Sequence, residues 1–282
     1  MNSIDAEKEI LPFARCPPAV NGNCLRCPFK GRSIIYGPFK SKRRGISIGI
    51  NLFPCVKICS FNCVYCFRGS TNRKVVNFTE GYLRLTTKVI EGALKEAIKS
   101  VGKVDAIDFS GSGEPTLHPR LNDFIDIVKK VNKEMGCNAS IGIFTNSSTL
   151  NNPKVINTLI KLDHVEAKLD TVIEWKFKII NRPHKNLSVS NIIENLRKFR
   201  RVYDGFLAIQ IMLLKYIKVS NYTKRDAILM AEALTSIEPD AVHVYTVYRQ
   251  PRLKTVSKPS YDVIKRYADI LLSYGLRVEV FT

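Results

Sequence analysis

The chain has 282 residues, of which 45% are hydrophobic and 24% are charged, and this composition excludes a globally disordered protein. It contains 44 Lys and Arg against 25 Asp and Glu, so its formal net charge is +19. Such an excess predicts a polyanionic partner such as nucleic acid, although a lysine-rich solvated surface gives the same count. No apolar run approaches the roughly 20 residues that span a bilayer. The start Met1–Ile10 is polar and acidic, unlike a secretory signal, so we expect a cytoplasmic protein with no membrane partner.

Residues 1–45 show no regular hydrophobic period. They are rich in proline and glycine, carry three cysteines and end in the basic run Lys40–Arg44. We interpret them as an irregular, cysteine-containing and basic N-terminal extension, which precedes one domain over residues 46–282.

From residue 46 onward, strand-like and helix-like segments alternate. The predicted strands are Ile46–Phe53, Ala106–Ser110, Ser140–Thr145, His164–Asp170, Phe206–Leu214, Ala241–Val247 and Arg277–Phe281. The predicted helices are Thr86–Ser100, Leu121–Met135, Lys154–Lys161, Val189–Arg201, Lys224–Ser236 and Tyr261–Ser273. This alternation predicts an α/β fold with a parallel sheet, either an open, partial (β/α)6-type barrel or a doubly wound sheet.

Several predicted strands place polar residues on one face. Glu166, Lys168 and Asp170 alternate with apolar residues, and Gln210 and His243 lie on the polar faces of two later strands. Parallel strands that are buried on both faces are apolar throughout. The pattern therefore favours a barrel with a polar interior that can hold ligands. An antiparallel sheet with one solvated face is the alternative, and the helical patterns between the strands argue against it.

Seven of the eight cysteines fall in the first quarter of the chain, and Cys59, Cys63 and Cys66 share one short loop after the first predicted strand. In a reducing cytosol, clustered thiols bind metal or carry out redox chemistry. Three thiolates can hold three irons of a cubane cluster and leave the fourth iron without a protein ligand. Zinc is the alternative, although structural zinc sites prefer four ligands in two pairs.

Two turns follow the next two predicted strands, at the edge of the sheet where ligands bind in such barrels. The first contains Gly111, Gly113, Glu114 and Pro115, so its backbone can approach a ligand closely and Glu114 can accept a hydrogen bond from an ammonium group. The second contains Asn146 and Ser147, which suit the hydroxyl groups of a ribose. Taken alone, the first is also compatible with an ordinary turn.

These residues carry a family resemblance. The spacing Cys59-x3-Cys63-x2-Cys66, with Tyr65 before the last cysteine, resembles the signature of the radical S-adenosylmethionine (SAM) superfamily. The stretch Gly111–Pro115 resembles its Gly-Gly-Glu motif, with Ser112 in place of the first glycine. Further stretches, such as Lys168–Asp170 and Asn181–Pro183, are similar to iron–sulfur oxidoreductases related to the tRNA wyosine synthases.

The resemblance implies an enzyme whose [4Fe-4S] cluster is bound by Cys59, Cys63 and Cys66. An electron donor such as flavodoxin or ferredoxin would reduce the cluster, and cleavage of SAM would give a 5′-deoxyadenosyl radical that abstracts a substrate hydrogen. Tyr65 would lie beside the adenine. The turn that begins at Gly111 would bring Gly113, Glu114 and Pro115 near the methionine ammonium, and Asn146 or Ser147 would lie near the ribose. The alternation places four further residues inside the barrel, as contacts of cofactor or substrate or as structural hydrogen-bond partners: Lys168, Asp170, Gln210 and His243.

Four further cysteines lie upstream of the loop: Cys16, Cys24, Cys27 and Cys55. They could hold a second [4Fe-4S] cluster or zinc, or they could be unligated. The wyosine synthases also carry an N-terminal cysteine trio with a second cluster, but the spacing here does not match theirs closely.

Basic segments are interleaved with the aromatic residues Phe67, Trp175, Phe199, Tyr203 and Tyr248. The segments are Lys40–Arg44, Arg68–Lys74, Arg182–Lys185, Arg197–Arg201 and Arg249–Lys254. Arginine and aromatic side chains together suit phosphate contacts and base stacking, and a base must leave its stack to enter a barrel. The leading hypothesis is a radical enzyme that modifies RNA, specifically tRNA. The alternatives are a radical enzyme that acts on a peptide, partner protein or small metabolite, and a non-catalytic iron–sulfur or zinc protein that binds nucleic acid.

Overall fold

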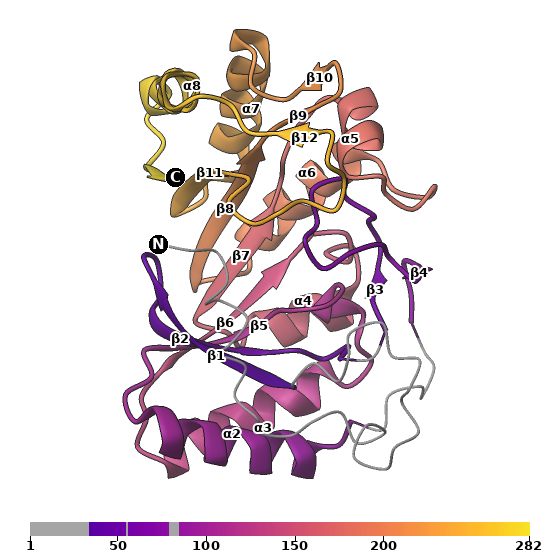
Figure 1. Ribbon diagram of the computed structural model, residues 1–282. Coiled ribbons are helices and arrows are strands. Elements are labelled where there is room, and N and C mark those ends of the chain that lie inside the picture. The colour runs from indigo at the N-terminus through magenta and orange to yellow at the C-terminus, as the bar shows by residue number, and fades with distance from the viewer. Residues whose placement is uncertain (1–33, 55, 79–84) are drawn as a thin grey trace.

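The structure, a computed structural model, describes residues 34–54, 56–78 and 85–282. Eight strands form one curved sheet in the order β1–β2–β5–β6–β7–β8–β11–β13 (Figure 1). Their bounds are β1 (Ile35–Ser41), β2 (Gly45–Ile50), β5 (Ala106–Phe109), β6 (Ser140–Thr145), β7 (His164–Lys168), β8 (Phe206–Leu213), β11 (Ala241–Thr246) and β13 (Val278–Phe281). From β2 to β13 all neighbours are parallel and follow chain order, whereas a doubly wound sheet reverses its order. The predicted α/β partial barrel is therefore confirmed.

Helices cover the outer, convex face of the sheet (Figure 1). They are α2 (Thr87–Val101), α3 (Leu121–Glu134), α4 (Pro153–Leu159), α5 (Glu174–Ile180), α6 (Val189–Arg200), α7 (Lys224–Ile237) and α8 (Tyr261–Ser273). Side-chain caps fix four of these helix starts, because the side-chain oxygens of the N-cap residues accept hydrogen bonds from backbone N–H groups of the first turn. The capping residues are Thr86, Asn152, Ser188 and Thr223. The six predicted helices are confirmed, and α5 was not predicted.

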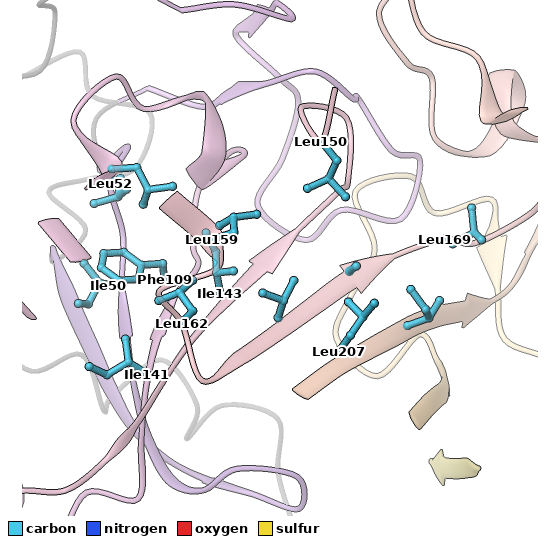
Figure 2. Packing of buried hydrophobic residues seen from close by; sticks show 14 of the residues in the cluster. Ile50, Leu52, Phe109, Ile141, Ile143, Leu150, Leu159, Leu162, Leu169 and Leu207 are labelled. Carbon is cyan, nitrogen blue, oxygen red and sulfur yellow. The ribbon is translucent and has the colours of Figure 1, made fainter. Parts of the chain in front are cut away.

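The hydrophobic core lies between the sheet and these helices. Figure 2 shows Ile50, Phe109 and Ile143, which come from neighbouring strands, beside Leu159 of α4. All four side chains are almost completely buried. Because successive strand residues point to opposite faces, packing the apolar face against the helices leaves the polar face for the inside of the barrel.

Strand β1 corrects the prediction of irregular structure for residues 35–41. It pairs antiparallel with β2, with Ile35 opposite Ile50 and Ser41 opposite Gly45, and a bulge interrupts the register between Tyr36 and Phe39. Pro38 lies in this bulge and hides the strand pattern in the sequence. A proline is tolerated here because β1 is an edge strand.

Several short elements lie at the C-terminal end of the parallel strands. They are β3 (Ile58–Cys59), β4 (Arg73–Lys74), the 3-10 helix η2 (Pro115–Leu117), β9 (Lys215–Tyr216), β10 (Val219–Ser220) and β12 (Val256–Ser257). Within the described residues, no helix combines the length and the apolar character that crossing a membrane requires.

Candidate functional site

The loop that carries Cys59, Cys63 and Cys66 is tied to the barrel on two sides. On one side, Ile58 forms a parallel bridge with Gly113, and the Glu114 N–H donates to the Ile58 carbonyl at 2.8 Å. On the other side, the Val64 N–H donates to the carbonyl of Ile180, at the end of α5, at 2.9 Å. These contacts hold the three cysteines over the C-terminal end of the parallel strands, as the sequence predicts.

Each of the three sulfur atoms accepts a hydrogen bond from a different side chain. The donors are Asn146 for Cys59 (3.4 Å), Asn181 for Cys63 (3.6 Å) and Lys57 for Cys66 (3.0 Å). Burial raises the pKa of the Cys59 thiol, and it raises the pKa of Cys63 to about 11. Negative charge on these sulfurs therefore requires a compensating positive charge, which a bound metal supplies.

The turn after β5 needs its two glycines in order to reach the cysteine loop. Gly111 and Gly113 have φ angles of +116° and +101°, a region that favours glycine. A Cβ atom on Gly113 would lie 2.1 Å from the Ile58 carbonyl oxygen, and one on Gly111 would lie 2.7 Å from Oδ1 of Asn51. The backbone of this turn thus lies directly against the loop that carries the cysteines.

Glu114 is buried, and its carboxylate points into the protein. It accepts hydrogen bonds from the hydroxyl groups of Thr116 (2.6 Å) and Thr145 (2.7 Å), from the Asn146 N–H (2.6 Å) and from the Thr116 N–H (3.2 Å). Burial raises the pKa of Glu114 against the opposing effect of these bonds. The side chain therefore connects the turn after β5 with the end of β6 and holds Asn146 beside Cys59. The next residue, Pro115, begins η2.

Asp170 connects four surrounding residues inside the barrel, near the cysteine loop. Its carboxylate accepts hydrogen bonds from the Tyr65 hydroxyl, from Nδ2 of Asn181 (2.7 Å) and from the Met212 N–H (2.9 Å), and it pairs with Lys168 at 3.1 Å. The Lys168 ammonium lies 5.2 Å from the centroid of the Tyr65 ring. Although burial lowers the pKa of Lys168, Asp170 and Tyr245 raise it above its usual value, so this lysine is charged. Tyr65 is thereby fixed in orientation next to the cysteine loop.

Gln210 and His243 lie deeper in the barrel, around Glu166. Gln210 donates to Glu166 at 3.1 Å, and His243 and His164 bond the same carboxylate at 2.8 and 3.0 Å. Arg43, from the turn between β1 and β2, forms an ion pair with it. Burial opposes the charge of Glu166, but the histidine hydrogen bonds and Arg43 hold its pKa well below the usual range. The predicted interior position is confirmed, whereas a cofactor contact stays a prediction.

The structure corrects part of the predicted basic and aromatic surface. Arg43 and Arg44 of the run Lys40–Arg44 face inward and pair with buried Glu166 and Asp108, so their charges are already compensated. The rings of Phe199 and Tyr203 are completely buried and cannot stack on a base, while Phe67, Trp175 and Tyr248 are exposed.

The profile of the Radical SAM superfamily matches residues 53–221, which is more than half of the chain. The chain belongs to the radical SAM superfamily. The predicted resemblance is thus confirmed, and with it an enzyme of a family that uses a [4Fe-4S] cluster and SAM.

Relatives extend over most of this radical SAM chain. It is 36% identical over 236 residues to the UPF0026 protein MJ1312 of Methanocaldococcus jannaschii, covering 83% of this chain and 70% of that one. It is 26% identical over 225 residues to the probable dual-specificity RNA methyltransferase RlmN of Thermosipho melanesiensis, covering 79% and 62%. The crystal structure of a radical SAM methyltransferase from Sphaerobacter thermophilus shares the fold, with a TM-score of 0.66, 15% identity and coverage of 88% and 68%.

The residues present fit the cofactors of a radical SAM enzyme. Ser112 Oγ and Asn181 Oδ1 are buried and have no hydrogen-bond partner among the described residues. Buried polar atoms are nearly always hydrogen-bonded, so these two are available for the polar groups of a ligand. Among residues 34–54, 56–78 and 85–282, no three Cys, His, Asp or Glu side chains converge on one point that could hold a single ion. A cubane cluster does not require this, because each thiolate binds its own iron.

Lys57 and Tyr245 were not singled out from the sequence. Lys57 lies two residues before Cys59, so the period of two of an extended chain places it on the same face. Tyr245 shares the inner face of β11 with His243 by the same rule and bonds Lys168 and Gln210. The predicted ligands of a second cluster, Cys16, Cys24, Cys27 and Cys55, lie outside the described residues.

Proposed function

We propose that this radical SAM enzyme binds its [4Fe-4S] cluster through Cys59, Cys63 and Cys66 and modifies RNA. The observation that carries the cluster assignment is the set of three sulfurs on one anchored loop, each with its own hydrogen-bond donor. When bound, the cluster and SAM supply a 5′-deoxyadenosyl radical that removes a hydrogen atom from the substrate.

The surrounding residues have distinct roles in this proposal. Ser112 Oγ and Asn181 Oδ1 accept hydrogen bonds from the ammonium and hydroxyl groups of SAM, because they are buried acceptors near the cysteine loop that donors of the described residues leave free. Tyr65, fixed by Asp170, presents its ring to the adenine. Glu114 is a positioning residue, since its carboxylate is already filled by protein donors and it orients Asn146 toward Cys59.

RNA as the substrate is supported by charge and by kinship. The chain has a formal net charge of +19, and basic residues lie beside the cysteine loop. Arg182 is one of these, because its carbonyl accepts a hydrogen bond from Asn62 in the loop. A relative across most of the chain is named an RNA methyltransferase. A phosphate backbone is attracted to such a surface in a salt-dependent way.

The cluster assignment is tested by anaerobic reconstitution with iron and sulfide. Wild-type protein is expected to show iron–sulfur absorbance and to release 5′-deoxyadenosine from SAM when dithionite or reduced flavodoxin is added. Cys63→Ala should lose both properties. Cys137→Ala, which removes another free cysteine, should keep both. A colourless wild-type protein with zinc on this loop would contradict the assignment.

The substrate assignment is tested by the nucleoside composition of tRNA and ribosomal RNA from cells that lack the gene. A modified nucleoside should be missing, should return with the wild-type gene and should stay missing with the Cys63→Ala gene. Unchanged RNA, together with 5′-deoxyadenosine release that is stimulated by peptides or metabolites, would reject RNA as the substrate.

The second cluster on Cys16, Cys24, Cys27 and Cys55 stays a prediction. Two [4Fe-4S] clusters would give about eight irons per chain after reconstitution. About four irons, with a spectrum that Cys16→Ala leaves unchanged, would reject it.

A further inference from the structure

Three arginines gather where the cysteine loop ends. Arg68 follows Cys66 by two residues, and Arg249 and Arg252 lie in the loop after β11, which passes beside the cysteine loop (Figure 1). The guanidinium groups of Arg68 and Arg249 lie 4.9 and 4.6 Å from the centroid of the same ring, Phe67. Arg252 donates a hydrogen bond to the Ser70 hydroxyl at 3.1 Å. The two loops therefore bring three positive charges to residues 67–70.

No carboxylate of the described residues pairs with these three arginines. Nε of Arg68 and both Nε and Nη2 of Arg252 are buried, and no described residue forms a hydrogen bond with them. Some other arginines of the described residues do pair with a carboxylate, for example Arg44 with Asp108 at 3.0 Å and Arg200 with Asp240 at 2.8 Å. Although Arg249 is exposed as a residue, partial loss of hydration and the charge of Arg68 both lower its pKa. Like charges held together with spare donors are stabilised by a bound anion.

The arginines lie at the opening of the barrel. Arg68 also stacks on the Tyr36 ring at 5.1 Å, and the Tyr36 hydroxyl bonds Ser110 at the end of β5. The Arg249 guanidinium lies 5.9 Å from the ring of Phe39 in β1. The three arginines thus lie between β1 and the loop after β11. This position is beside the cysteine loop, at the open side of the curved sheet.

Exposed aromatic rings accompany the unpaired guanidinium groups. The side chain of Phe67 is 44% exposed and that of Tyr248, next to Arg249, is 91% exposed. Single-stranded nucleic acids are bound by this combination, in which arginines hold phosphates and aromatic rings stack on bases. A plain carboxylate ligand would leave the two rings without a role.

We infer that Arg68, Arg249 and Arg252 bind a phosphate group of the substrate at the barrel opening, with an adjacent base on Phe67 or Tyr248. This inference rests on the proposed RNA function for the nature of the ligand. It adds the place at which the nucleic acid is held, and it separates phosphate binding from the cysteine loop and the barrel interior.

The test measures binding of a short fluorescent single-stranded RNA to the reconstituted protein, with inorganic tripolyphosphate as competitor. Arg249→Gln and Arg252→Gln should each weaken RNA binding about tenfold and lower the slope of log affinity against log salt by about one. Arg249→Lys, which keeps the charge but loses the planar guanidinium group, should recover only part of the affinity. Arg266→Gln removes an exposed charge from α8 and should change neither quantity. Circular dichroism and thermal unfolding check that each variant is folded.

The outcomes separate this inference from the proposed function. Arginine-dependent binding of both RNA and tripolyphosphate supports both. Arginine-dependent binding of tripolyphosphate without any binding of RNA supports the phosphate site and rejects RNA. RNA binding that Arg249→Gln and Arg266→Gln weaken equally overturns the phosphate site and leaves the RNA proposal standing. Failure of the wild-type protein to bind either probe overturns the inference.

Discussion

Lys57 offers a direct test of how the protein controls charge at the cysteine loop. The residue is 2% exposed, and its ammonium group donates to Cys66 Sγ at 3.0 Å and to the Gly69 carbonyl at 2.6 Å. Lys57 forms no ion pair with a carboxylate of the described residues. Its positive charge is therefore not compensated by a carboxylate before it acts on the sulfurs. Reduction of a cluster on these sulfurs adds one electron, which the ammonium attracts. Lys57→Met keeps the apolar stem and removes the charge, so the midpoint potential should fall.

The size of the shift follows from Coulomb's law. For an effective separation of about 6–8 Å between Nζ and the added electron, and an effective dielectric constant of ~20, Coulomb's law gives an attraction of about 2–3 kcal/mol. This corresponds to about 90–120 mV for a one-electron couple. A redox titration followed by electron paramagnetic resonance measures the shift.

Two further variants control for structural effects at Lys57. Lys57→Arg, which keeps the charge, should stay near the wild-type potential. Lys88→Met, at an exposed position on α2, should equal the wild type. A fully loaded Lys57→Met protein with an unchanged potential would refute the reasoning.

Three other predictions concern the frame of the site, and chemical denaturation of the apoprotein measures all of them. Gly113→Ala should cost several-fold more stability than Gly275→Ala, because both glycines have positive φ but only the first would place a Cβ against backbone; equal costs would contradict the close approach. Burial lowers the pKa of His118 to about 4. The folded protein therefore keeps the whole stability contribution of neutral His118 above the unfolded pKa of about 6.5, and it loses this contribution as the pH falls toward 4. His118→Gln should therefore reduce the loss of stability between pH 7 and pH 4.5 by about 2–3 kcal/mol, and an unchanged pH dependence would reject this role. Arg43→Met should cost about 3–5 kcal/mol, and adding Glu166→Gln should restore part of it, because the first change leaves a buried carboxylate without its arginine partner; purely additive costs would show that the pair is not coupled.

Much of the fold could be predicted because its signals are local. The period of two in Val165–Asp170 and the 3.6-residue period of α3 and α6 are set by packing against a common core, so they are visible in the chain itself. Strand β1 was not predicted because Gly37 and Pro38 interrupt its alternation of apolar and polar residues. Helix α5 was not predicted because its seven residues, which lack a side-chain cap, are too few to show a helical period.

The site was only partly predictable because its contacts join distant segments. The cysteine spacing and the glycine turn are short motifs with a mechanism of their own, and the structure places them in contact. In contrast, nothing in the sequence around Arg43 shows that it pairs with Glu166, 123 residues away. The sequence of Lys40–Arg44 therefore predicts a charged surface, because charged residues are mostly exposed. In the structure, its two arginines form ion pairs inside the barrel.

The distribution of paired and unpaired charge links the site to the substrate. Among the described residues, three acidic side chains of the barrel interior have a basic partner: Asp108 with Arg44, Glu166 with Arg43, and Asp170 with Lys168. The buried Glu114 is bonded by neutral donors instead. The interior therefore offers little net charge to a ligand, while the three arginines at the opening keep theirs. A phosphate gains most by staying at the opening, where donors are free, and it would lose its hydration without a partner if it moved inward. An uncharged base loses less hydration free energy than a phosphate. Under the proposed RNA function, the charge pattern would therefore hold the backbone outside while a base approaches the shielded reaction centre.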